Sequence, residues 1–443
     1  MDRREFIKIG AATAAAPLVL GACNNSSERA SASEVSSDVQ GQVARHYEGV
    51  SLLGYGCMRW PTYKAEDGKQ KIDQQKVNDL VDYAISHGVN YFDTAPVYLE
   101  GESERATAEA LSRYPRSSYL LATKLSNFGD WTYESSRQMF HRSLEIFNTS
   151  YVDYYLLHSI GSAADFDRRF ASTGIMDYLL KEREQGRIRN RGFSVHGDRE
   201  GFDELMALHS KYHWDFVQIQ MNYVDWAHAG ARNTNAQYLY TKLDEMDIPI
   251  VIMEPLRGGR LADLPAAISD KMKAREPSRS LSSWAFRFVG SFPRVMCVLS
   301  GMTYMEHLED NVKTFSSFKP LNSEEMNFLA EVADQLESYP LIRCTACQYC
   351  MPCPYGLNIP AIFKFYNDNV NAGTYVSSRE QEDYARVRRN YLRAYNKAIE
   401  PDRQADHCIG CGKCARECPQ HIAIPRELRR IDEYIESLKQ QTL

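Results

Sequence analysis

The chain has 443 residues and a formal net charge of −6; 44% of its residues are hydrophobic and 25% are charged. This length accommodates a large barrel together with a second, smaller domain, and the hydrophobic content supports a sizeable core. The acidic balance provides no basic surface for nucleic acid, so we expect no nucleic-acid partner.

The first residues are expected to be a targeting segment rather than part of the fold. Arg3 and Arg4 precede an apolar run over residues 9–22, which is too short to span a bilayer and ends in Leu-Gly-Ala before Cys23. Residues 1–23 resemble a twin-arginine export signal with a lipobox. We therefore expect export to the periplasmic side or cell envelope, with lipid on Cys23 anchoring the protein to a membrane surface. A chance basic and apolar start is the alternative.

After a polar tether over residues 24–46, short apolar runs alternate with amphipathic helical patterns through residues 47–325. The apolar runs are residues 89–92, 119–122, 154–157, 191–193, 216–219, 249–252 and 295–299. One helical face carries Val77, Leu80, Val81, Ala84 and Ile85 and ends near Gly88. Repeated strand–helix units predict parallel strands, and eight such units fit a TIM barrel. An open doubly wound sheet is the alternative, although Gly-Tyr-Gly at residues 54–56 lacks the third glycine of its dinucleotide-binding turn.

Polar residues follow three consecutive apolar runs. Asp93, Lys124 and His158 each close a run, and Tyr98 lies five residues beyond Asp93. Polar side chains at the carboxyl ends of barrel strands meet at one mouth, so we expect these four to converge there. Asp93 would keep Lys124 charged, the Lys124 cation would favour the Tyr98 phenolate, and Tyr98 would donate a proton to a carbonyl oxygen. Four unrelated structural residues are the alternative.

Residues 326–443 contain two arrays of four cysteines, which hold eight of the 11 cysteines in the chain. The arrays are Cys344, Cys347, Cys350 and Cys353, then Cys408, Cys411, Cys414 and Cys418, and each is followed by proline. The second has the C-x2-C-x2-C-x3-C-P spacing of a two-cluster ferredoxin, and the first is one residue shorter before Cys353. We expect two 4Fe-4S clusters, with zinc sites or disulfides as alternatives.

In the two-cluster pattern the last cysteine of each array binds the cluster of the other array. Cys418 would therefore join the first three cysteines of the first array. Cys353 would join the first three cysteines of the second array, and its shortened spacing makes it the ligand that departs most from the pattern. These ligand sets place two one-electron carriers at the carboxyl end of the chain.

The strand-end motifs and the cysteine arrays together carry a resemblance to a known family. The motifs are Asp93-Thr94-Ala95-x-x-Tyr98, Ala122-Thr123-Lys124, Asp153-Tyr154-Tyr155-Leu156-Leu157-His158, Gly192-Phe193-Ser194 and Met253-Glu254-Pro255-Leu256. The chain resembles the ferredoxin-fused, iron–sulfur branch of the aldo-keto reductases. The resemblance implies a (β/α)8 barrel followed by a mainly helical, bacterial-ferredoxin-like two-cluster domain. It also implies hydride transfer between a nicotinamide and a carbonyl, with Tyr98 as general acid, His158 orienting the carbonyl, and Lys124 and Asp93 tuning Tyr98.

The same resemblance assigns cofactor-binding positions. Ser194, at the fifth strand end, would be one of them, Gln218 would bind the nicotinamide carboxamide, and Asn311 would contact adenine unless it caps a helix. Met253 stands where relatives place an aromatic residue that stacks on the nicotinamide. The resemblance thus allows NAD(H) or NADP(H) as cofactor.

NADPH preference is not expected. Relatives specific for NADPH place cations near the positions of Gly301 and His307 to hold the 2′-phosphate, and this chain has none at either position. A phosphate dianion needs charged partners. Arg257 and Arg260 could bind an anion instead, or belong to a solvated loop.

Three functions are consistent with these patterns. The first is an exported oxidoreductase that reduces a carbonyl or oxidises an alcohol, sugar-like compounds included, with electrons relayed through the two clusters. Hydride carries two electrons and a cluster one, so a flavin or quinone protein is an expected electron partner. The alternative is an electron-transfer protein whose barrel binds no nicotinamide and serves for docking. A surface lipoprotein without catalytic activity is the third.

Overall fold

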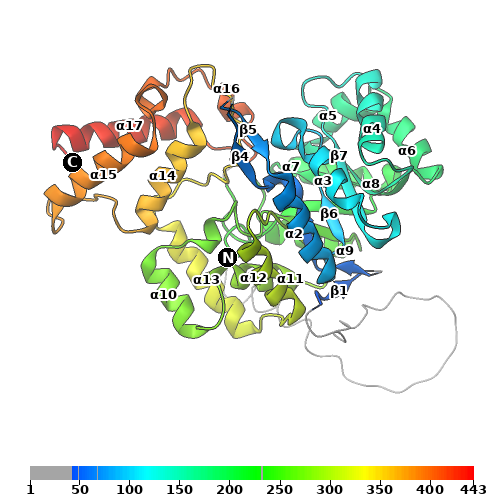
Figure 1. Cartoon of the computed structure of the whole chain (residues 1–443), viewed down its shortest axis with the longest axis horizontal. Coiled ribbons are helices and arrows are strands. Elements are labelled where there is room, and N and C mark those ends of the chain that lie inside the picture. Colours follow the sequence, from blue (N-terminus) through cyan, green and yellow to red (C-terminus); the bar gives the residue numbers. More distant parts are fainter. Residues whose placement is uncertain (1–41, 48, 67, 231–232) are drawn as a thin grey trace.

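The computed structural model describes residues 42–47, 49–66, 68–230 and 233–443 (Figure 1). The expected export signal with Arg3, Arg4 and Cys23, and most of the expected tether, lie outside these residues. Within the described part of the chain, no helix combines the length and apolar character needed to cross a bilayer.

Eight parallel strands form a closed barrel. They are β3 (Leu53–Gly56), β6 (Tyr91–Asp93), β7 (Leu120–Leu125), β8 (Val152–Ile160), β9 (Ile188–Val195), β10 (Phe216–Gln220), β11 (Ile250–Met253) and β12 (Val295–Ser300). Neighbours in the chain are neighbours in the barrel, and β12 closes it against β3 with Val298 opposite Leu53. The predicted TIM barrel is confirmed, and the doubly wound sheet is excluded because the sheet has no open edge.

Helices surround the strands as crossovers. The longer ones are α2 (Gln74–Ser86), α3 (Ser103–Leu111), α4 (Tyr133–Ile146), α6 (Ile175–Glu184), α7 (Arg199–Ala207), α9 (Ala236–Glu245), α10 (Ala266–Arg275), α11 (Leu281–Gly290) and α12 (Met305–Ser316). In α2 the Asp73 side chain accepts from the Lys76 amide at 3.3 Å and caps the first turn. Four residues of the predicted apolar face of α2 are buried, Ile85 is half-buried, and Gly88 follows the helix with a φ of 87°.

The interior of the barrel is apolar and closed at its amino-terminal end. Tyr91, Leu156, Phe216 and Val251 pack there with Val50. Val50 belongs to the hairpin of β1 (Arg45–His46) and β2 (Val50–Ser51), which precedes the first barrel strand. A second hairpin, β4 (Thr62–Lys64) with β5 (Gln70–Ile72), leaves the opposite end after β3. Because apolar side chains fill the amino-terminal end, a site with polar groups is expected at the carboxyl end of the barrel.

The chain has a second apolar core beyond the barrel. Helix α13 (Ser323–Glu337) still packs on the barrel core, whereas the second core begins at Ile342. Its helices are α14 (Ile359–Asn371), α15 (Tyr384–Ala398), the short α16 (Lys413–Arg416) and α17 (Ile424–Gln440). The predicted helical carboxyl-terminal domain is thus confirmed as a fold, but the two cores separate after α13, whereas the predicted boundary between residues 325 and 326 falls inside this helix.

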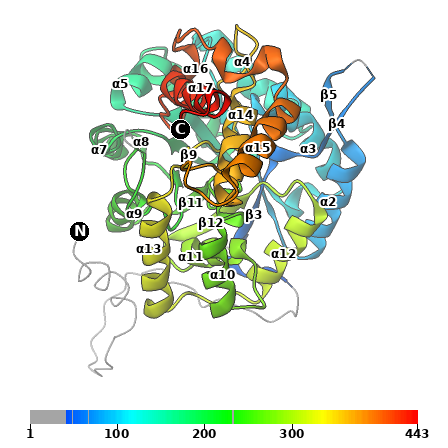
Figure 2. The same ribbon diagram turned by 90° about the vertical axis from the view of Figure 1, so that its left-hand side faces the viewer.

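The helical domain lies against one end of the barrel. Figure 1 shows α14, α15 and α17 together on one side of the barrel, and Figure 2 shows them in front of its strands. Contacts described below connect this domain to loops that follow β10 and β11. The domain therefore lies over the end where the polar strand-end residues emerge.

Candidate active site

Lys124 and Asp93 form a buried ion pair at the barrel mouth. Lys124 Nζ lies 2.5 Å from Asp93 Oδ1 and donates to the Thr94 carbonyl oxygen at 2.8 Å. Both side chains are at most 4% exposed. Strands β6 and β7 pair with Asp93 opposite Ala122, so their carboxyl ends place the two groups side by side. Two of the predicted residues therefore meet as the strand pattern predicts.

Tyr98 joins this pair from a strained turn. It begins the 3-10 helix η2 (Tyr98–Gly101), in which Leu99 and Glu100 have φ values of 51° and 57°. Two consecutive left-handed residues with side chains cost about 1–3 kcal/mol each and are common at functional sites. Lys124 Nζ lies 5.0 Å from the centre of the Tyr98 ring. The turn thus holds the phenol over the buried ion pair.

His158 completes the predicted set. Its ring centre lies 5.8 Å from that of Tyr98. The Ser126 hydroxyl lies 2.6 Å from Nδ1, and Arg169 donates to the backbone oxygen of His158 at 2.8 Å. Burial lowers the pKa of His158 well below its usual value, and the Lys124 cation lowers it further. The ring is therefore neutral near pH 7, and when Ser126 donates to Nδ1, Nε2 carries a hydrogen for a ligand.

The electrostatics of Tyr98 differ from the sequence-based expectation. Burial raises the pKa of Tyr98 well above its ordinary value, and the neighbouring Tyr349 and Asp93 raise it further. Lys124 Nζ donates to Asp93 and Thr94 and lies over the face of the phenol ring. Burial therefore outweighs the phenolate-favouring effect expected of the Lys124 cation. Tyr98 stays protonated and is a proton donor.

We expect replacement of Lys124 by Ala to lower the free energy of unfolding by about 3–5 kcal/mol, because it leaves Asp93 buried without its cation. Burial already raises the pKa of Asp93, and Lys124 opposes that effect. Urea unfolding followed by tryptophan fluorescence measures the change. The control is the double variant Asp93→Asn/Lys124→Met, which removes both charges and should lose less. Equal losses would show that the ion pair does not set the penalty.

The side chains predicted to bind a nucleotide are buried, and most of them form hydrogen bonds within the protein. Ser194 accepts the Ser159 amide at 2.8 Å. Asn311 lies inside α12, where its Nδ2 donates to Ser300 Oγ at 3.0 Å, so it is not a helix cap. Gln218 stands beside Ser194 in the β9–β10 register, and its Oε1 has no hydrogen-bond partner among the described residues.

The eight cysteines fall into two groups that cross between the arrays. Burial raises the pKa of Cys350 to about 12, and the neighbouring thiols of Cys347, Cys344 and Cys418 raise it further. Burial likewise raises the pKa of Cys414 to about 11, with further increases from Cys408, Cys353 and Cys411. The last cysteine of each array therefore lies with the first three of the other array, as the two-cluster pattern requires.

Each group presents four thiols, which is the donor set of a 4Fe-4S cluster. No three His, Cys, Asp or Glu side chains of the described residues are placed to hold one metal ion. In a 4Fe-4S cluster each cysteine binds a different iron, so its four sulfurs stand farther apart than the ligands of one zinc ion. The donor set of four thiols per group fits that requirement.

Comparison with known proteins identifies both parts of the chain. Residues 52–334 match the aldo/keto reductase family. The chain belongs to the aldo/keto reductase family. Residues 343–424 of this reductase match a 4Fe-4S dicluster domain. The predicted oxidoreductase is thereby confirmed, together with its ferredoxin-like domain.

Individual relatives resemble the barrel of this reductase. The uncharacterized oxidoreductase YqkF of Bacillus subtilis is 24% identical over 310 residues, which are 63% of this chain and 92% of that protein. Methylglyoxal reductase YeaE of Escherichia coli is 28% identical, over 59% of this chain and 85% of that protein. An aldo/keto reductase from Klebsiella pneumoniae, solved with NADP and acetate, has a TM-score of 0.52 at 21% identity and covers 67% of this chain and 96% of that one.

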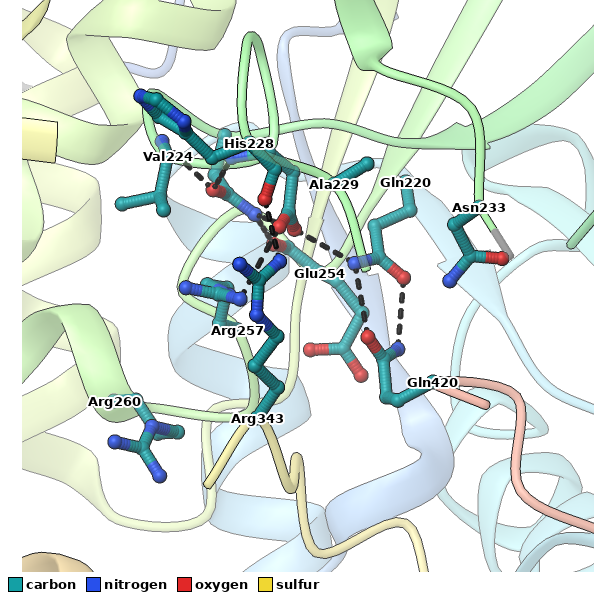
Figure 3. Close-up of polar contacts among 12 residues, drawn as sticks. Gln220, Val224, His228, Ala229, Asn233, Glu254, Arg257, Arg260, Arg343 and Gln420 are labelled. Carbon is teal, nitrogen blue, oxygen red and sulfur yellow. Dashed lines mark hydrogen bonds and ion pairs between the residues drawn. The ribbon is translucent and has the colours of Figure 1, made fainter. Parts of the chain in front are cut away.

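The dicluster domain of this reductase is fastened to the barrel by several polar contacts (Figure 3). The side-chain amides of Gln220 and Gln420 exchange hydrogen bonds of 3.2 and 2.8 Å. Arg343 donates to the His228 backbone oxygen at 2.6 Å, and Asn233 donates to the Pro419 oxygen at 3.2 Å. These contacts hold the chain next to Cys344 and next to Cys418 against the barrel.

One residue of the first array reaches the active site. Tyr349 lies between Cys347 and Cys350, and its ring centre is 6.5 Å from that of Phe128. Burial raises the pKa of Tyr349, and the nearby Tyr98 lowers it; Tyr349 also adds to the raised pKa of the buried Tyr98, so the two phenols are neighbours. Cysteine spacing carries no information about this contact.

Proposed function

We propose that this reductase interconverts small carbonyl compounds and alcohols at the site formed by Asp93, Tyr98, Lys124 and His158, with electrons relayed through two 4Fe-4S clusters. The observation that supports the proposal best is the contact between Tyr349, inside the first cysteine array, and Tyr98. The cysteine loop of the redox domain lies next to the proton donor of the barrel, so electron transfer and proton transfer can act on the same substrate.

His158 and Tyr98 have complementary roles. The neutral imidazole would donate from Nε2 to a carbonyl oxygen and hold it, and Tyr98 would give that oxygen its proton. Transfer of this proton leaves a phenolate, which the Lys124 cation beneath the ring stabilises. Asp93 keeps that cation in place through its 2.5 Å ion pair. Reduction of the carbonyl to an alcohol takes two electrons and two protons: one electron would come from each cluster, Tyr98 would give the proton on oxygen, and water would supply the proton on carbon.

The thiols of Cys344, Cys347, Cys350 and Cys418 would hold one cluster, and those of Cys408, Cys411, Cys414 and Cys353 the other. When bound, such clusters supply or accept single electrons. Loading requires loss of the thiol protons, so iron binding releases protons. The electron partner would be a flavin or quinone protein, which exchanges electrons singly with a cluster and in pairs with other carriers.

The substrate class follows from the carbonyl chemistry and from relatives such as the methylglyoxal reductase. The test supplies anaerobically purified protein with reduced methyl viologen, a one-electron dye, and with methylglyoxal or glyceraldehyde. We expect dye oxidation that depends on the carbonyl compound and yields the alcohol. Dye oxidation without alcohol would favour a pure electron-transfer protein instead.

We also propose that the protein is exported by the twin-arginine route and anchored through lipid on Cys23. The support is the Arg3-Arg4 pair and the Leu-Gly-Ala-Cys motif of the sequence. Changing Arg3 and Arg4 to Lys should leave the precursor in the cytoplasm, since this route reads the arginine pair. Fractionation followed by mass spectrometry of the mature amino terminus measures this outcome. A variant processed at Cys23 as efficiently as the wild type would contradict the proposal.

A further inference from the structure

The first cysteine array lies across the barrel face that a nicotinamide nucleotide would need. We call the segment from Ile342 to Cys350 the cluster loop. The family resemblance places the nucleotide near Met253, the last residue of β11, and near Gly301, which follows β12. Three residues of the cluster loop, Ile342, Thr345 and Tyr349, make contacts from this region to Tyr98.

Thr345 packs tightly at the centre of this face. It is 2% exposed, and its backbone oxygen accepts from Arg59 Nη2 at 2.5 Å. Gly258, in the loop after β11, has a φ of 70°, and a Cβ atom there would lie 2.3 Å from the Thr345 oxygen. The approach of the two backbones therefore requires glycine at this position. The cluster loop and the barrel loop leave no room for another molecule between them.

The cations that could replace the missing phosphate ligands are occupied. Arg59 packs against Gly301, since a Cβ at Gly301 would lie 3.0 Å from Arg59 Cδ. The Arg59 guanidinium donates to the cluster loop. Arg260 donates to the Ile342 oxygen at 2.5 Å. Arg257 is 8% exposed and lies 3.3 Å from Asp225 (Figure 3). An anion site at Arg257 and Arg260 was the alternative, but both cations are paired with groups of the protein.

We propose that the cluster loop takes the place of the nicotinamide nucleotide, so that the intact protein binds neither NADH nor NADPH. The loop runs from the phosphate end of the face, at Arg260 and Gly301, to the reacting end at Tyr98. Tyr349 brings the loop to the phenol, where a nicotinamide would otherwise lie. The inference rests on the proposed function in taking Tyr98 as the reacting centre, and it makes the dicluster domain the built-in redox group of the barrel.

Calorimetric titration of the anaerobically purified, iron-loaded protein tests this directly. NADH and NADPH should give no saturable heat up to about 1 mM. The Klebsiella pneumoniae relative solved with NADP is the positive control. Saturable one-to-one binding with a Kd below about 0.1 mM would overturn the proposal. Neither titration requires turnover, so this result is independent of whether the proposed reaction occurs.

A matched pair of glycine variants shows whether the loop is the cause. Gly258→Ala forces a Cβ into Thr345, whereas Gly259, with a φ of 95°, has no atom within 4 Å of the equivalent Cβ. Both changes strain the backbone, and only the first should displace the loop. We expect Gly258→Ala to speed amide hydrogen exchange in residues 342–350 and to gain at least ~10-fold in affinity for one nucleotide. Gly259→Ala should do neither.

Two outcomes would overturn the explanation. Faster exchange in Gly258→Ala without any gain in nucleotide binding would show that the cluster loop is not what excludes the nucleotide. Unchanged exchange in both variants would show that the loop is not packed against Gly258 in solution.

Discussion

Replacing Tyr98 with Phe is expected to lower the rate of carbonyl reduction at least ~100-fold, because it removes the only proposed proton donor and keeps the ring. Burial, Tyr349 and Asp93 hold the pKa of Tyr98 well above its ordinary value, so the wild-type hydroxyl is protonated throughout the neutral range. The assay is methylglyoxal-dependent oxidation of reduced methyl viologen under saturating dye.

The control for this variant is Tyr63→Phe. Tyr63 lies in the β4–β5 hairpin and is 50% exposed, so its replacement makes the same chemical change away from the site. It should retain wild-type turnover, and both variants should keep the wild-type iron content. Full activity in Tyr98→Phe would show that the barrel does not use its tyrosine as aldo-keto reductases are expected to.

Replacing Cys418 with Ser should lower the iron content from about eight to about four per chain, with a matching loss of acid-labile sulfide. Cys418 belongs to the second array but lies with Cys344, Cys347 and Cys350. Its loss removes one ligand from that group and none from the other. Iron analysis after anaerobic purification, with electron paramagnetic resonance of the reduced protein, distinguishes the remaining cluster.

Two further variants make this result specific. Cys353→Ser should also lose about four irons, but from the group that contains Cys414, so its reduced spectrum should differ from that of Cys418→Ser. Cys297→Ala changes a buried cysteine of β12 outside both arrays and should keep all the iron. Zinc in the purified protein, or full iron content in Cys418→Ser, would contradict the two-cluster assignment.

The strands and the polar residues at their ends were predictable from the sequence. Buried parallel strands are short apolar runs, and Asp93, Lys124 and His158 interrupt them where each strand leaves the barrel. Such signals are local in the chain. The cysteine spacing is equally local, which is why the exchange of Cys353 and Cys418 between the two groups could be anticipated.

Contacts that depend on docking were not predictable. Tyr349 meets Tyr98, and Arg59 meets Thr345, across more than two hundred positions of the chain. No period or spacing relates such pairs. The raised pKa of Tyr98 could not be predicted for the same reason. The direction of the pKa shift depends on how deeply the site is covered and on where Lys124 points, and the sequence motif specifies neither.

The exchange of the last cysteines between the arrays also sets the order in which barrel folding and cluster assembly can occur. The thiol group around Cys350 is complete only when Cys418, near the end of the chain, has been synthesised. The barrel strands precede every residue of both arrays, so the barrel can close before either group exists. The cluster around Cys350 could therefore be assembled only after Cys418 has been synthesised, onto a barrel that is already closed.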